Sequence, residues 1–262
     1  MRALHTAATG MMAQELNVQV ISNNIANMRT TGYKRQRAEF QDLLYQHVRR
    51  VGTQTSDQGN ILPAGIELGS GVKTVGTPRV MSQGNISPTS KDFDVAIRGE
   101  GFFRILLPDG RTAYTRDGSF EIDAQGRIVT GQGYVLQPGI TVPPNSTGIT
   151  INQQGQVSVS QPGQTTPTQI GQIDLSMFVN KAGLQALGDN LYVETPASGT
   201  PQQGQPNVDG FGNLQQGNLE QANVEAVNEI SDLIAAQRAY EMNAKVITAA
   251  DQMLSATSNL MR

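Results

Sequence analysis

The sequence lacks cysteine and tryptophan, and it contains no long hydrophobic run. Without cysteine, the chain forms no disulfide and offers neither a thiolate nucleophile nor a cysteine-ligated metal site. No stretch of about 18 apolar residues occurs, so we expect no transmembrane helix. The amino-terminal stretch has one early arginine, Arg2, but no continuous apolar segment, and we therefore expect no cleaved signal peptide of the Sec type.

Charged residues are also scarce, at 16% of the chain, and the net charge is −3. This balance gives no reason to expect nucleic acid as a partner. Positive charge gathers only locally, which we interpret as a solvated face or a contact with acidic neighbours, at Arg29, Lys34, Arg35, Arg37, Arg49 and Arg50. Glycine, glutamine, asparagine and threonine are abundant instead, and this composition is typical of turn-rich β structure.

The segment Gln221–Arg262 contains neither proline nor glycine and predicts one long helix, roughly 50 to 60 Å in length. Three adjacent rows repeat every seven residues and predict a stripe down one face with a mild left-handed supercoil. The rows are Leu233, Tyr240, Ile247 and Leu254; then Ala239, Val246, Met253 and Leu260; then Ala236, Asn243, Ala250 and Thr257. Taken alone, such a stripe is also typical of a core helix in a globular domain.

The amino-terminal residues carry a matching pattern. Leu4, Met11, Val18 and Ile25 are spaced by seven, and Ala7, Ile21 and Met28 form a second row that Gln14 interrupts. We expect a helix over about Ala3–Ile25. The simplest arrangement is a coiled coil formed by the two ends of the chain, with the middle looped out. Two helices alone leave flanks partly uncovered for neighbouring copies, at residues such as Leu16, Val20, Val246 and Met253.

The segment after the first helix reads as irregular and extended. Asparagines at 23, 24 and 27 and a glycine at 32 predict a helix end with a sharp change of direction. Residues 35–50 fit either a short helix or an extended arm. Residues 51–71 are rich in Gly, Thr, Gln and Ser, have no clear period, and are interpreted as a long loop or extended excursion.

From residue 91 the pattern becomes β. Short apolar stretches alternate with turn sequences such as Pro108–Gly110 and Asp117–Gly118, which predicts a small antiparallel barrel or sandwich over 91–194. The fold class is therefore α+β. We expect a first helix over 1–30, an extended linker region over 31–90, the β domain over 91–194, a linker over 195–220 and a closing helix over 221–262.

No motif predicts catalysis, a cofactor or a metal site. The Gly-x-Gly at Gly99–Gly101 lacks a third glycine and a following helix. The two histidines, His5 and His47, have no ligand spacing, and no G-x-S-x-G occurs. A carboxylate-rich region leaves an acid pair for glycoside cleavage open, although several of its members sit at turns: Asp92, Asp94, Asp109, Asp117, Glu121 and Asp123.

Several stretches together resemble the flagellar rod and hook family of axial proteins, over essentially the whole chain. The run ISNNIANMRTTGYKRQRAEFQDLLY, Ile21–Tyr45, resembles the family's rod signature. SQGNIS from Ser82 resembles its SxGNL element, with Ile86 where leucine is commoner. DVAIRGEGFF from Asp94 and AYTRDGSFEIDAQGRIVT from Ala113 look like its β-domain core, and Gly217–Leu254, with the run Gln237–Glu241, is similar to its closing helix.

The resemblance implies a structural subunit, not an enzyme, that self-assembles into a straight hollow tube, transmits motor torque to the hook and encloses the export channel. Gly52–Gly69 looks like the insertion of the distal rod members. Implied partners are further copies of the chain, proximal rod proteins, the hook protein or hook–rod junction, the P-ring and L-ring bushing, and the flagellar type III export apparatus. The implied location is the basal body, where the rod crosses the periplasm.

The residues that we expect at the subunit interface come from both ends of the chain. They are Leu4, Met11, Val18, Ile21, Asn24, Ile25, Asn27, Gly32, Tyr33, Leu233, Tyr240, Val246, Ile247, Met253 and Leu254. Alternatives remain open at this point: a proximal rod or hook subunit of the same family, a periplasmic binding module whose helices form a dimerisation stalk, or an enzyme acting on peptidoglycan.

Overall fold

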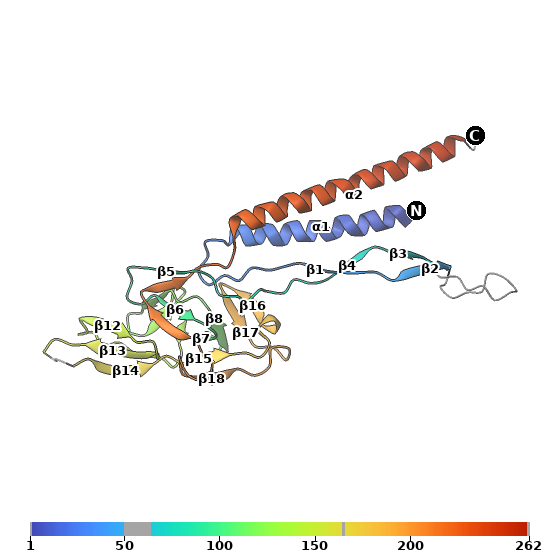
Figure 1. The fold of residues 1–262 in the computed structure, drawn as a ribbon. Helices are drawn as coiled ribbons and strands as arrows, with labels where there is room; N and C mark the ends of the chain where they lie inside the picture. Colours follow the sequence, from blue (N-terminus) through green and yellow to red (C-terminus); the bar gives the residue numbers. More distant parts are fainter. Residues whose placement is uncertain (1, 50–63, 164–165, 261–262) are drawn as a thin grey trace. The chain divides into compact units, whose positions relative to one another are not determined.

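The computed structural model describes residues 2–49, 64–163 and 166–260. It confirms an α+β architecture, in which a helix near each end of the chain flanks a central antiparallel β-rich region (Figure 1). Helix α1 spans Arg2–Ala26 and helix α2 spans Ala226–Leu260. Within the described residues, neither helix nor any other element combines the length and the apolar character needed to span a bilayer.

The chain divides into two compact units. Unit 1 comprises Met1–Ile25, Gln36–Pro78 and Glu225–Arg262, and unit 2 comprises Ala26–Arg35 and Arg79–Val224. Each unit is therefore built from segments that are far apart in the sequence. Residues near both ends of the chain have to come together before either unit is complete.

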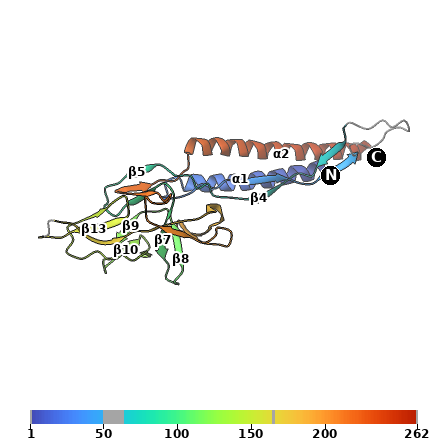
Figure 2. The same ribbon diagram turned by 60° about the horizontal axis from the view of Figure 1, so that its bottom comes forward.

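Unit 1 contains the two helices and a narrow antiparallel ribbon, and Figures 1 and 2 both show α1 and α2 side by side. The segment that was expected as a short helix or an extended arm is extended. Strand β1 (Glu39–Asp42) pairs with β4 (Val72–Gly76), and β2 (Tyr45–Arg49) pairs with β3 (Ile66–Gly69). The ribbon reaches α1 at Gly71, where a Cβ would lie 2.2 Å from the Thr9 Oγ1.

Helix α2 begins five residues later than the sequence predicted. Residues Asn218–Glu220 form strand β20, which pairs with β5 (Ile86–Pro88), and the Gln221 N–H continues this ladder by donating to the Asn85 carbonyl at 2.8 Å. The Asn223 side chain then binds loop backbone, donating to the Val80 carbonyl at 2.7 Å and accepting from the Arg35 N–H at 2.8 Å. The helix begins only after these contacts, because the β ladder uses backbone groups of 218–221 and the Asn223 side chain is bound to loop backbone.

Unit 2 is built from antiparallel pairs. Its main sheet has the order β16-β17-β8-β7-β11-β10-β9, with β15 joining β7 to β18. Smaller ladders are β12-β13-β14, β19-β6 and β20-β5. The remaining bounds are β6 Val95–Arg98, β7 Phe102–Leu106, β8 Thr112–Thr115, β9 Phe120–Ile122, β10 Ile128–Thr130, β11 Val135–Leu136, β12 Gly148–Ile151, β13 Gln156–Ser160, β14 Thr168–Gln172, β15 Leu175–Met177, β16 Gln185–Gly188, β17 Leu191–Val193, β18 Gln202–Gly204, β19 Asn213–Gln216 and a short 3₁₀ turn at Lys181–Gly183.

Strand β7 shows how unit 2 buries both faces of its main sheet. Phe103 and Ile105 are fully buried in the larger core, whereas Phe102 points to a second, aromatic cluster. There the Phe102 ring meets Phe178 edge-on at 5.9 Å between centroids. Alternate residues of a strand face opposite sides, so the buried neighbours Phe102 and Phe103 show that β7 is covered on both sides where it begins.

The segment 195–220, which was expected to be a linker, holds strands β18, β19 and β20. Strand β19 pairs along its length with β6, from Asn213 opposite Arg98 to Gln216 opposite Val95. Leu214 supplies the buried side chain of β19, at 1% exposure. Residues near the carboxyl end of the central region therefore complete the β core.

Candidate functional site

The two terminal helices meet along a seam of small and polar side chains. The buried side chains of α1 are Ala7, Ala13, Val20, Ile21 and Asn24. On α2 the buried row is Glu229, Ala236 and Ala250, with Asn243 half-buried between them. A Cβ added at Gly10 would lie 3.0 Å from the Asn243 Nδ2. The helices approach closely at this point because glycine leaves room for the asparagine.

This seam is the third of the three rows read from the sequence. The other two rows flank it and are only partly covered. Tyr240 and Leu254 are each 44% exposed, Val246 is 47% exposed, and Met253 is 64% exposed. Large apolar side chains that a monomer leaves uncovered along one element mark a surface for protein–protein contact.

A groove lies between the two helices beside Tyr240. It has a volume of about 480 Å³ and is lined by Glu15, Val18 and Gln19 from α1 and by Gln237, Tyr240 and Glu241 from α2. Two of the side chains predicted for the subunit interface, Val18 and Tyr240, therefore line one groove.

The other residues predicted for the interface differ in burial. Ile21, Asn24 and Gly32 are buried within the chain. Gly32 takes a left-handed conformation (φ 68°), and a Cβ there would lie 2.7 Å from the Asp117 backbone nitrogen. Side chains that are half-buried are Leu4, Met11, Val18, Ile25, Asn27, Tyr33, Leu233 and Ile247.

In unit 2, the segment that precedes α2 binds the segment that follows α1 through one buried carboxylate, that of Glu220. The side chain of Glu220 has no exposed surface, and its Oε1 lies 2.6 Å from the Lys34 Nζ while its Oε2 lies 3.1 Å from the Arg116 Nε. The Gly84 N–H donates to the same Oε1 at 2.9 Å, and the Gly32 N–H donates to the Glu220 carbonyl at 2.8 Å. We call Lys34, Arg116 and Glu220 the Glu220 cluster.

The two cations of this cluster are bound from several sides. Lys34 also donates to the Ser82 carbonyl at 2.8 Å, and Arg116 donates to the Gly101 and Gly99 carbonyls at 2.7 and 2.9 Å. Burial lowers the pKa of Lys34 below 10.5, and Glu220 opposes this shift because its charge favours the ammonium. Burial likewise lowers the pKa of Arg116.

The Glu220 cluster was missed at the level of sequence. Lys34 had been grouped with neighbouring arginines as a solvated or contact patch, yet it is 1% exposed. Its partner Glu220 lies 186 residues away, and no periodicity connects the two. The available signal was that both residues lie inside family-like stretches, TTGYK and GNLEQA.

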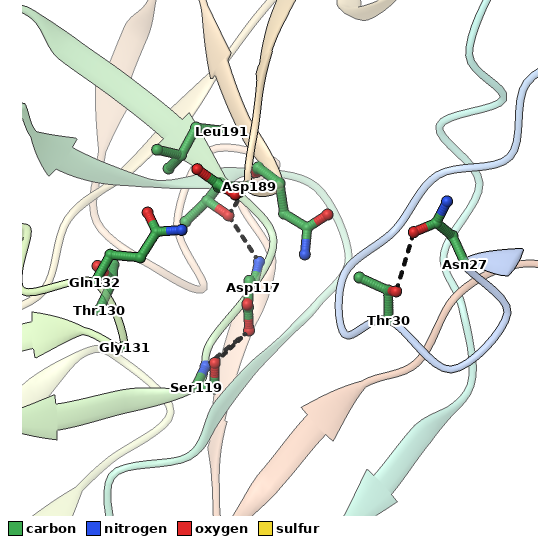
Figure 3. Close-up of a pocket in the computed structure, with 11 residues that line it drawn as sticks. Asn27, Thr30, Asp117, Ser119, Thr130, Gly131, Gln132, Asp189 and Leu191 are labelled. Atoms are coloured by element: carbon green, nitrogen blue, oxygen red, sulfur yellow. Dashed lines mark hydrogen bonds between the residues drawn. The ribbon is translucent and has the colours of Figure 1, made fainter. Parts of the chain in front are cut away.

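A polar pocket of about 430 Å³ also lies in unit 2 (Figure 3). Asn27 and Thr30 line it, together with Asp117, Ser119, Thr130, Gln132 and the turn at Asp189. Burial raises the pKa of Asp117, although its Oδ1 accepts from the Ser119 N–H and hydroxyl at 3.0 and 2.8 Å. Within the described residues, no three His, Cys, Asp or Glu side chains are grouped to share a metal ion.

The carboxylate-rich region noted in the sequence serves local structure. Asp109 pairs with Arg111 at 2.6 Å, Asp123 pairs with Arg127 at 2.7 Å, and Glu121 lies 3.6 Å from Lys91. Asp109 and Asp123 also accept backbone N–H groups two residues on, as aspartates in turns do. These carboxylates are accounted for by turn and surface contacts.

Comparison with known proteins places family matches at both ends and in the β unit. Residues 4–34 match the model of the flagella basal body rod protein, residues 96–159 match the flagellar hook protein FlgE/F/G D1 domain, and residues 215–260 match the flagellar basal body rod FlgEFG protein C-terminal domain. The first and last of these matches cover the terminal helices and the segments carrying Lys34 and Glu220.

Relatives that match over their full length are flagellar basal-body rod proteins as well. The flagellar basal-body rod protein FlgG of Caulobacter vibrioides is 57% identical over 260 residues, which is 99% of each chain. FlgG of Buchnera aphidicola subsp. Schizaphis graminum is 50% identical over 258 residues, covering 98% of this chain and 99% of the relative. FlgG of Agrobacterium fabrum is 49% identical over 262 residues and the whole of both chains.

Proposed function

This chain belongs to the family of flagellar basal-body rod proteins, whose members are structural proteins and not enzymes, and we propose that its copies assemble into the distal rod. In this proposal the rod is a straight hollow tube that transmits motor torque to the hook and encloses the export channel. Identical subunits joined through a heterologous, non-closing contact build such an open helix.

The uncovered apolar face of α2 is the observation that carries the self-assembly proposal. Tyr240, Val246 and Met253 are all more than two-fifths exposed, although they belong to two adjacent seven-residue rows of a helix-packing stripe. In an assembled tube these side chains would pack against helices of neighbouring copies, and α1 and α2 would form a coiled coil lining the inner wall.

The remaining residues of the proposed interface follow from the same arrangement. Leu4, Met11, Val18, Ile25, Leu233, Ile247 and Leu254 would flank the helix seam and contact neighbours, with Asn27 and Tyr33 at the helix end. Ile21, Asn24 and Gly32 are buried within the chain, so they would shape the interface by holding α1 and the following turn in place.

The other parts of the chain receive distinct roles in this proposal. The β domain over 91–194 would form the outer layer, reached through the extended region 31–90 and the segment 195–220. The segment Gly52–Gly69 would pack along the rod and keep it straight; residues 52–63 of it lie outside the described residues. The described part includes β3, which with β2 forms a ribbon whose residues are all exposed.

The proposed partners are those of a rod subunit. They are further copies of the chain, proximal rod proteins, the hook protein or hook–rod junction, the P-ring and L-ring bushing, and the flagellar type III export apparatus. We place the assembled protein in the basal body, where the rod crosses the periplasm, and propose export without a cleaved signal peptide. No cofactor, metal or nucleic acid enters the proposal.

Electron microscopy of the purified protein at rising concentration tests this function, and Tyr240→Asp sharpens the test. The unaltered chain is expected to form straight hollow tubes. The variant is expected to form none, because the substitution places a carboxylate in the groove that a neighbour would fill. Thr248→Asp, which introduces the same charge at an exposed position of α2 outside that groove, is the matched control.

Two results would count against the proposal. Wild-type yield of tubes from Tyr240→Asp would show that this helix face takes no part in assembly. A stable monomer or dimer of the unaltered chain at every concentration, even with preformed tube ends as seeds, would favour a binding module instead. The melting temperature of the β unit should be the same in all three proteins, so a folding defect is recognised separately.

A further inference from the structure

We propose that Asn24 and Glu229 act as a register lock that fixes which turn of α2 lies beside which turn of α1. The inference concerns a single chain and does not depend on the tube. Its consequence for assembly rests on the proposed function, because the register decides which exposed side chains the helix pair presents together.

The geometry around Asn24 is specific. This side chain is 2% exposed, its Oδ1 accepts the Gln36 N–H at 2.9 Å, and its Nδ2 donates to the Gln36 carbonyl at 2.9 Å. The amide is therefore paired through both its oxygen and its nitrogen with the backbone of one residue, Gln36, in the segment that follows α1. Such a double contact fixes the plane and the direction of the side chain.

The remaining hydrogen of the same amide faces α2. The Asn24 Nδ2 donates to the Glu229 Oε2 at 3.1 Å, and Glu229 is itself 3% exposed in the first turn of α2. The Glu229 N–H donates to the Glu225 carbonyl at 3.0 Å, so its backbone belongs to the first turn of the helix. A donor on one helix, oriented by Gln36, therefore meets a buried acceptor on the other.

The rest of the seam selects a register only weakly. On α2 the buried row continues as Ala236, Asn243 and Ala250, all spaced by seven residues, and it faces small residues of α1 such as Gly10. A slip of α2 by seven residues, roughly 10 Å at 1.5 Å per residue, would put an alanine beside Gly10 in place of Asn243, and this smaller side chain also fits there. The same slip would put Ala236 where Glu229 belongs and leave a buried amide and carboxylate without each other.

A buried polar contact that is satisfied in only one alignment is a known way to specify register at some cost in stability. The Asn24–Glu229 contact stands at one end of the seam, near the last residue of α1 and the first residue of α2. The small residues allow close approach along the seam, and the Asn24–Glu229 contact determines the alignment.

Introduced cysteines report the register directly, because the chain has none of its own. Gly10→Cys with Asn243→Cys reports the observed register, since a Cβ at residue 10 would lie 3.2 Å from the Asn243 Cγ. Gly10→Cys with Ala250→Cys, and Gly10→Cys with Ala236→Cys, report slips of seven residues in either direction. Each pair is oxidised in a glutathione buffer in the full chain, and the intramolecular disulfide is quantified by non-reducing electrophoresis of the monomer band.

In the unaltered background we expect the 10–243 disulfide to exceed either slipped disulfide by at least about tenfold, a ratio equivalent to about 1.4 kcal/mol. The double variant Asn24→Leu with Glu229→Leu removes the polar contact but keeps the seam filled. In that background the ratio should fall to about threefold or less, because an apolar pair has no single preferred alignment. Circular dichroism checks that helix content is kept.

An unchanged ratio in the double variant would overturn the register lock, as would a missing 10–243 disulfide in the unaltered background. If the double variant loses helix content, Asn24→Ala alone decides the question: the lock predicts a lower 10–243 ratio, and an unchanged ratio contradicts it. Tube formation is measured separately. A register that shifts as expected in a chain that never polymerises would reject the proposed function and leave the lock standing.

Discussion

The two units of the molecule bury their apolar side chains to very different degrees. In unit 2, Val95, Phe103 and Ile105 have no exposed surface, and strands from across the central region enclose one continuous core. In unit 1, Val227, Met242 and Met253 on α2 are each more than three-fifths exposed. Unit 2 therefore has the interior of a completed domain, whereas unit 1 has helices that are organised but only partly covered.

Under the proposed function, this contrast separates the part of the chain that is complete by itself from the helices that neighbouring copies would cover. Substitutions that affect one unit and leave the other unchanged test this difference.

The largest effect is expected from Glu220→Ala. This substitution leaves two buried cations, Lys34 and Arg116, without their shared carboxylate, and breaking a buried pair in this way costs about 3 to 5 kcal/mol. Urea unfolding of unit 2, followed by tyrosine fluorescence, measures the loss. Asp109→Ala, which removes an exposed partner of Arg111, is the control and should leave the midpoint nearly unchanged. Equal effects from the two substitutions would contradict the structural role of the cluster.

A smaller effect, about 1 to 3 kcal/mol, is expected from Gly32→Ala. The alanine would have to adopt the left-handed backbone conformation of Gly32, and its Cβ would lie 2.7 Å from the Asp117 backbone nitrogen. Gly131→Ala is the matched control, because nothing lies within 4 Å of its Cβ position. It should change the unfolding free energy by less than about 1 kcal/mol, in the stabilising direction. A tolerated Gly32→Ala would mean that the turn after α1 is not packed as described.

The smallest effect concerns Asp117 and pH. Burial raises the pKa of this carboxyl in the folded chain above 3.8, so the folded state holds more protons than the unfolded state just above that pH. The free energy of unfolding contributed by Asp117 therefore falls as pH rises through this window. Asp117→Asn should remove that fall and be neutral or stabilising at pH 7, as measured by thermal unfolding at several pH values. A steeper pH dependence of stability in the variant would contradict a raised pKa for Asp117.

Much of the β unit was predictable because its turns are explicit in the sequence. Pro108–Gly110 and Asp117–Gly118 separate apolar stretches, and β7, β8 and β9 appear where these stretches lie. Strands β19 and β20 were missed because glutamine and asparagine dominate them. They are strands because β6 and β5 supply partners, which is a tertiary effect that local propensity does not record.

The terminal helices were predicted from their seven-residue rows, but the sequence did not show which row faces inward. The predicted stripe combined large and small residues, and the structure buries Ala236 and Ala250 while Tyr240 stays 44% exposed. Alanine contributes little to an apolar pattern, yet it allows close approach of two backbones. The start of α2 was placed too early because Asn223 gives its side chain to loop backbone from distant segments.

Hydrogen exchange measured by mass spectrometry on the dispersed and the assembled protein tests the central claim most directly. We predict that strands over 95–193 are strongly protected in both states and that α1 and α2 gain protection when tubes form, most of all around Tyr240 and Val246. Equal and full protection of α2 in both states, or a gain confined to the β unit, would contradict the account that the terminal helices are completed by neighbouring copies.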